Sequence, residues 1–142
     1  MMASEYYDVK WLVPFFDLLE VIPVERGKPD SASTRAALRA LAAGRVLGVF
    51  PEGRIENTRE LLPFHTGIAL LAMRSGAPIY PAHLDGTQRG KEMGPAFAYR
   101  NRAILRFGPP LVIPRKTGRS ELSAATRQIE SAVKNLAGEV RQ

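Results

Sequence analysis

At 142 residues, with 45% hydrophobic and 24% charged side chains, the chain has the length and composition of one globular domain rather than of a disordered polypeptide. It contains no cysteine, which excludes a disulfide framework, a thiol nucleophile and a thiolate metal site. Two histidines and scattered carboxylates argue against a metal site as well. We therefore expect a function that needs neither sulfur nor a bound metal or cofactor.

The net charge of +6 is concentrated between Gly86 and Arg119, where eight basic residues are opposed by Glu92 alone. This concentration has two interpretations: ordinary solvated charge, or a basic face that attracts an anionic membrane surface. The basic residues are not interleaved with a motif that reads RNA or DNA, so nucleic acid is not an expected partner.

The longest apolar stretch without a formal charge runs from Leu61 to Met73, too short for a membrane span of roughly 20 residues. The first residues, Met1 to Glu5, have no basic segment leading into an apolar core, so no secretory signal is visible. These features predict a cytoplasmic protein.

The first predicted element is a short helix from about Val9 to Leu19, which includes Trp11, Pro14, Phe15 and Phe16. Its aromatic side chains are suited to core packing, and contact with a membrane or an acyl chain is the alternative. A strand from Glu20 to Glu25 follows, in which Pro23 indicates a sheet edge or a bulge.

A second helix is predicted to begin near Asp30, Ser31 or Ser33 and to end at about Ala43 before Gly44. The apolar run Arg45 to Phe50 then predicts a strand buried on both faces. Two strands joined by a helix should be parallel and linked by a right-handed crossover, which would bring Arg26 and Glu52 to the same sheet edge.

The remaining elements follow the same alternation of helix and strand. Pro63 should begin a helix that ends before Gly76, and a basic loop should span residues 85–101. Strands are predicted over residues 77–84, 103–107 and 111–113, and an amphipathic helix over 120–138. The predicted fold is a single α/β domain with an open, largely parallel or mixed sheet flanked by helices.

The sequence Phe50-Pro51-Glu52-Gly53-Arg54 follows the predicted strand at its carboxyl end, where open α/β sheets commonly hold ligands. Gly53 allows a backbone conformation or a close ligand approach that a side chain would block, and Arg54 offers a planar donor fork that suits phosphate. An ordinary surface turn with an incidental Glu and Arg is the alternative.

This pentapeptide stands among three further motifs: Ile22-Pro23-Val24-Glu25-Arg26, Phe64-His65-Thr66-Gly67 and Ile79-Tyr80-Pro81-Ala82-His83-Leu84. In order and spacing they resemble the second, third and fourth sequence blocks of the glycerolipid acyltransferase family, typified by lysophosphatidic acid acyltransferase. The resemblance extends from about Val9 to Leu136 and implies that family's α/β fold.

The resemblance also implies a phosphate-binding role for particular residues. Arg26 matches the arginine of the second block, while Glu52 and Gly53 match the glutamate and glycine of the third. Arg54 departs from the common pattern, which places arginine one position later, where this chain has Ile55. His65 stands where the family often has lysine, so it is either a phosphate contact or a histidine on a helix surface.

The family's reaction uses a first block, a His followed five positions later by Asp, in which the imidazole removes the proton from the attacking hydroxyl. Here Leu70 lies five positions after His65 and Gln88 five positions after His83, so no catalytic residue is assigned. We expect a domain truncated at its amino terminus, or a degenerate paralogue, that is itself inactive.

The implied parent activity is that of a 1-acylglycerol-3-phosphate O-acyltransferase in phospholipid biosynthesis. A fatty acyl group would pass from a thioester of coenzyme A or acyl carrier protein to the hydroxyl of a lysophospholipid, at the inner face of the membrane. The alternative is a non-catalytic module that binds anionic headgroups or a protein partner. Self-association through an apolar groove beside Trp11, Phe15 and Phe16 is also expected.

Overall fold

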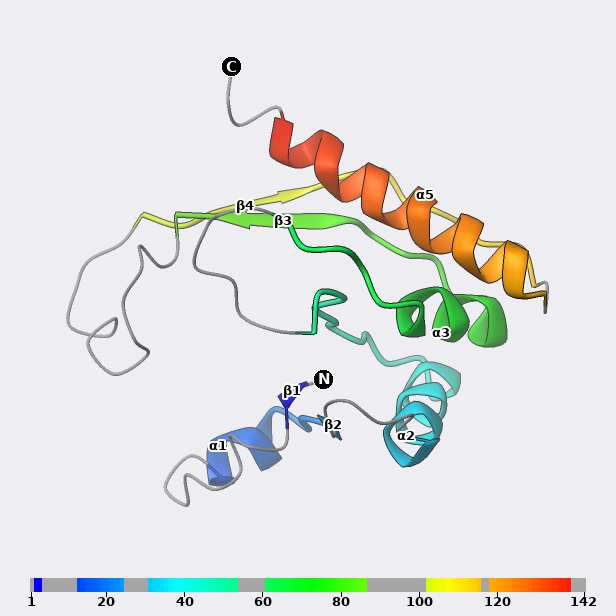
Figure 1. The fold of residues 1–142 in the computed structure, drawn as a ribbon. Helices are drawn as coiled ribbons and strands as arrows, with labels where there is room; N and C mark the ends of the chain where they lie inside the picture. Colours follow the sequence, from blue (N-terminus) through cyan, green and yellow to red (C-terminus); the bar gives the residue numbers. More distant parts are fainter. Residues whose placement is uncertain are drawn as a thin grey trace.

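A computed structural model describes residues 2–3, 13–24, 31–53, 61–86, 102–115 and 118–138. Figure 1 shows helix α5 lying along the β3–β4 ribbon, with α3 near one end of α5 and α2 next to α3. The elements in chain order are β1 (Met2–Ala3), α1 (Val13–Leu18), β2 (Pro23–Val24), α2 (Ser31–Ala42), α3 (Gly67–Ser75), β3 (Ala82–Asp85), β4 (Ile104–Phe107) and α5 (Arg119–Gly138).

The helices agree best with the sequence. Helix α2 ends in a left-handed glycine, Gly44 at φ 74°, where the Arg45 amide donates to the Ala40 carbonyl and the Gly44 amide to the Leu41 carbonyl. Helix α5 buries a stripe of residues that recur at helical spacing: Ala125, Thr126, Ile129, Val133 and Leu136. The helices predicted near residues 31–43 and 120–138 are therefore confirmed, and the one predicted from about Val9 to Leu19 is confirmed over Val13–Leu18, the part that the structure describes as helical.

The strands form two separate two-stranded sheets within the described residues, and not the single open sheet that the sequence predicts. β1 and β2 pair in parallel, with Met2 opposite Pro23, whereas β3 and β4 pair antiparallel, with Ala82 opposite Phe107. The mixed α/β class is consistent with this arrangement. Beyond the β3–β4 ribbon, Ile79 and Leu111 form one isolated antiparallel bridge.

The prediction of a buried strand over residues 45–50 is wrong. This segment pairs with no described strand, and the side chains of Val46 and Phe50 are 99% and 74% exposed. Its first residue, Arg45, forms an ion pair with Glu20, which follows α1. Because β2 pairs only with β1 among the described strands, the predicted parallel crossover from β2 through α2 is not formed.

Two further differences from the predicted elements occur at prolines. Pro63 does not begin a helix: α3 starts at Gly67, and residues 61–65 lack regular secondary structure. The predicted strand over 77–84 is reduced to the Ile79 bridge and to β3, since Pro78 and Pro81 have no amide hydrogen for a ladder. Of the strand predicted at 111–113, only Leu111 pairs.

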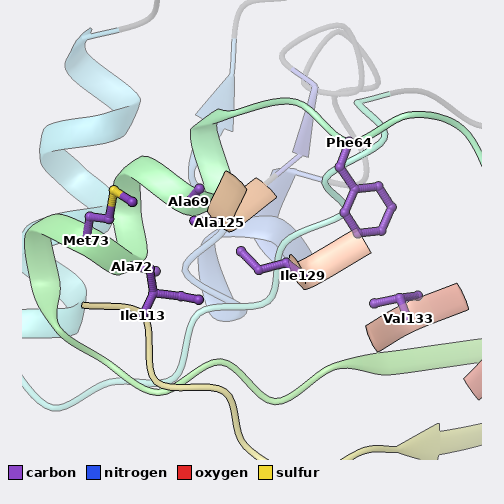
Figure 2. Close-up of a cluster of buried hydrophobic side chains, with 8 residues drawn as sticks. All are labelled: Phe64, Ala69, Ala72, Met73, Ile113, Ala125, Ile129 and Val133. Carbon is purple, nitrogen blue, oxygen red and sulfur yellow. The ribbon is translucent and has the colours of Figure 1, made fainter. Parts of the chain in front are cut away.

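The core lies between α3 and α5. Figure 2 shows its eight buried side chains: Phe64, Ala69, Ala72, Met73, Ile113, Ala125, Ile129 and Val133. Phe16 of α1 is also buried, at 7% exposure, so it does not line the exposed groove predicted there. Trp11 and the side chain of Phe15 lie outside the described part of the chain.

Candidate functional site

The candidate site is a tight turn, Phe50 to Gly53, which we call the Glu-Gly turn. The Gly53 amide donates to the Phe50 carbonyl oxygen at 3.3 Å. Gly53 has a φ of 70°, in the left-handed region that side chains rarely adopt. This left-handed backbone conformation therefore explains why the sequence has glycine at this position.

Two hydrogen bonds join the Glu-Gly turn to the segment of residues 61–65. The carboxylate oxygen Oε2 of Glu52 accepts from the Leu62 amide at 3.0 Å, across ten positions of sequence. Beside it, the His65 amide donates to the Pro51 carbonyl oxygen at 2.9 Å. The turn is consequently attached to a second part of the chain at two successive residues.

The side chain of His65 lies against the turn as well. A Cβ placed on Gly53 would be 2.8 Å from Cδ2 and 2.9 Å from Nε2 of the imidazole, closer than real Cβ atoms approach. His65 is otherwise exposed and precedes α3, so it does not lie on a helix surface. Its ring could therefore contact a ligand that approaches Gly53.

The 61–65 segment is anchored to the core from its other side. Phe64 is buried against α5, and its amide donates to Oε2 of Glu130 at 3.2 Å. Oε1 of Glu130 accepts from Nζ of Lys134 at 2.5 Å. These two bonds, that of Lys134 first, lower the pKa of Glu130 below its ordinary value, against the opposing effect of burial.

Three of the five predicted site residues, Glu52, Gly53 and His65, are brought together by this geometry. Arg26 and Arg54 lie outside the described residues. Sequence reasoning missed Glu130. Its only visible signal is Lys134 four positions later, a spacing that is common on any helix surface.

Other features of the described residues lie apart from the turn. A cavity of about 440 Å³ between α2 and the end of α3 is lined by Leu38, Leu41, Ala42 and residues 74–77, none of which belongs to the turn. Within these ranges no group of three or more His, Asp or Glu side chains is placed to hold a metal ion. None of the helices described has the length and apolar character needed to cross a membrane.

Comparison with known proteins gives a consistent set of relatives. A family model described as Acyltransferase matches residues 1–85, more than half of the chain. The 1-acyl-sn-glycerol-3-phosphate acyltransferase of Bacillus subtilis is 27% identical, over 100% of this chain and 70% of its own length. No solved structure matches.

Two yeast relatives match over a shorter part. An uncharacterized acyltransferase of Schizosaccharomyces pombe is 33% identical over 54% of this chain, and glycerol-3-phosphate O-acyltransferase 2 of Saccharomyces cerevisiae is 27% identical over 63%. The matched parts are only 11% and 12% of those proteins. The chain therefore spans about a tenth of each yeast relative.

Proposed function

The chain belongs to the glycerolipid acyltransferase family, and from this premise we propose that its Glu-Gly turn binds the phosphate of lysophosphatidate or a related glycerol phosphate lipid. The observation that carries the proposal is the contact between Gly53 and His65. Gly53 has no side chain of its own, and the imidazole of His65 lies beside its backbone. Arg26 and Arg54 would add the guanidinium groups.

Charge and geometry support this assignment. A phosphate monoester carries about −1.5 to −2 charges at neutral pH, and an arginine fork can bind two of its oxygens. Arg54 directly follows Gly53 in sequence, so the turn and the guanidinium can act on one group. His65 would contribute a further donor from its exposed ring.

The reaction in which such a site takes part is acyl transfer from a thioester of coenzyme A or acyl carrier protein. The lipid hydroxyl attacks the thioester carbonyl, the new ester bond forms, and the C–S bond breaks to release the thiol. A base must take the proton of the hydroxyl. Since this chain has no His followed by Asp at the required spacing, we propose that it binds the phosphate without itself transferring the acyl group.

A non-catalytic lipid-binding module is the second candidate, and the same missing pair favours it. In that case the basic residues between Gly86 and Arg119 would hold an anionic membrane surface, with the protein peripheral at the inner face. Binding to anionic vesicles that weakens with salt, combined with no transfer by any longer form of the protein, would support this role.

The binding proposal is tested by titrating glycerol 3-phosphate into the wild-type chain and into Arg54→Ala. Loss of a charged hydrogen bond should weaken binding by roughly 1.5–3 kcal/mol. Arg39→Ala is the matched control, because it removes an exposed arginine from the last turn of α2. Equal affinity of Arg54→Ala and wild type would remove Arg54 from the site.

A further inference from the structure

We infer that Glu52 acts as a positioning residue: its carboxylate holds the Leu62 amide and thereby sets the shape of the Glu-Gly turn, without touching the phosphate. This inference rests on the proposed phosphate site. It assigns the family's third-block glutamate, in this chain, to the backbone of a distant segment. The phosphate contacts then fall to the groups around Gly53.

The chemistry of a carboxylate supports this division of roles. An ionised carboxylate only accepts hydrogen bonds, so it offers no donor to a phosphate, and the two anions repel each other. Glu52 already has a donor, since its Oε2 lies 3.0 Å from the Leu62 nitrogen in a half-buried position. A hydrogen bond to a charged acceptor is among the stronger ones in a protein.

The bond is also well placed to control the turn. Leu62 lies two positions before Phe64, which is fixed in the core and bonded to Glu130. His65 comes next, with its amide on Pro51 and its ring on Gly53. Glu52 therefore connects the turn to a segment that α5 holds in place, and loss of its acceptor should free the turn at one of its two bonds.

The test compares Glu52→Gln with Glu52→Ala. Glutamine keeps an acceptor oxygen of similar reach and loses the charge, whereas alanine loses both. Two quantities are measured: hydrogen exchange of the Leu62 amide by NMR, and the dissociation constant for glycerol 3-phosphate by calorimetry. Asp17→Asn, which removes an exposed carboxylate from α1, controls for the change in net charge.

For Glu52→Ala we expect Leu62 exchange to accelerate at least about 10-fold and the dissociation constant to rise by a similar factor. Glu52→Gln should stay within about 3-fold of wild type in both quantities, because its carbonyl oxygen replaces the lost acceptor. Asp17→Asn should leave both unchanged.

Three results would overturn the inference. Equal loss of affinity in both Glu52 variants, with Leu62 still protected in Glu52→Gln, would mean that the carboxylate acts on the ligand directly. Tighter binding by Glu52→Gln, about 10-fold or more, would place the carboxylate beside the phosphate. Fast exchange of the Leu62 amide in the wild type would show that its hydrogen bond to Glu52 is not formed in solution. If the wild type binds no glycerol 3-phosphate, the proposed phosphate site fails, and protection of the Leu62 amide decides separately whether Glu52 holds the segment.

Discussion

The imidazole of His65 lies against the backbone of Gly53, so closely that a Cβ on Gly53 would be 2.8 Å from its Cδ2 atom. The two residues are brought together by the hydrogen bonds of Glu52 to Leu62 and of His65 to Pro51. Position 53 is thus restricted twice, by a left-handed φ of 70° and by the ring above it. Each restriction can be measured separately.

Gly53→Ala should lower the free energy of unfolding by about 1–2 kcal/mol for the left-handed backbone alone, with a further loss from displacing His65. Gly44→Ala is the matched control, because Gly44 has a φ of 74° and, apart from its chain neighbours, no atom of the described residues lies within 4 Å of the position that a Cβ would take. Chemical denaturation of both variants separates the backbone cost from the steric one.

The steric part should be relieved by a second substitution. Measured relative to His65→Ala alone, the loss of unfolding free energy that Gly53→Ala causes in the double variant should approach the loss caused by Gly44→Ala. An equal cost for Gly53→Ala with and without His65 would show that the ring moves aside freely, and the close contact would then have no energetic weight.

Glu130 predicts a dependence of stability on pH. Its pKa in the folded chain is lowered from 4.5, chiefly by the hydrogen bond from Lys134 and then by that from the Phe64 amide. A lowered folded pKa means that the unfolded chain binds the proton more readily. The stabilisation is therefore fully present above about pH 4.5 and is lost as the pH falls through the folded pKa.

The measurement is the difference in unfolding free energy between wild type and Glu130→Gln as the pH is lowered. Because Lys134 is 55% exposed, the difference should be about 1 kcal/mol or less at neutral pH, and it should vanish in acid. Asp17→Asn serves as the control. A difference that stays constant down to about pH 3, below the ordinary carboxylate range, would show that the charge of Glu130 contributes nothing.

Arg106 and His83 form a cross-strand pair on the β3–β4 ribbon, and one nitrogen of each, Nη1 and Nδ1, is buried with no hydrogen-bond partner among the described residues. A buried unsatisfied donor costs about 1–3 kcal/mol. Arg106→Met should therefore raise the free energy of unfolding. The net gain should be up to about 1 kcal/mol, because the loss of packing by the arginine methylenes offsets part of the relief of the buried donor. Arg102→Met, at an exposed position beside β4, should change it little.

Thermal and chemical unfolding of Arg106→Met, Arg102→Met and the wild type measure these differences in unfolding free energy. Destabilisation by Arg106→Met beyond about 1 kcal/mol would mean that the guanidinium makes a favourable contact that outweighs its buried nitrogen.

The helices were predictable because their signals are local. A stripe of apolar residues with period 3.6, and a glycine that can take a left-handed φ, depend only on neighbours within a few positions. These signals identified α2 with Gly44, α3 with Gly76, and α5. The start of α3 was misplaced because Pro63 is equally suited to a non-helical segment, and here the amides of Leu62 and Phe64 donate to carboxylates instead.

The strands could not be predicted as well, because a strand needs a partner that can lie anywhere in the chain. Residues 45–50 have the composition of a buried strand, yet Val46 is exposed and pairs with no described strand. On the β3–β4 ribbon, Leu105 and Phe107 are exposed while His83 and Arg106 face the covered side, the reverse of the usual pattern. Composition cannot reveal which face a ribbon turns toward a helix.

The site was predictable as a set of residue types but not as a set of contacts. The order of the motifs indicated Glu52, Gly53 and His65, and the structure brings them together. That Glu52 bonds a backbone amide ten residues away, and that Glu130 supports the same segment from α5, depends on tertiary packing that no local pattern encodes.

The two histidines of this chain lack the family's Asp partner, which bears on acyl transfer. General-base assistance is typically worth about 10²–10⁴-fold in rate, and neither His65 nor His83 is followed by Asp at the family spacing. With lysophosphatidate and an acyl thioester, this 142-residue chain should therefore release thiol at the background rate. The Bacillus subtilis relative, assayed under the same conditions, is the positive control. Turnover comparable with that of the relative would contradict the prediction. It would require a base among His65, His83 and Glu52, which His65→Ala, His83→Ala and Glu52→Gln would then distinguish by which of them abolishes the release.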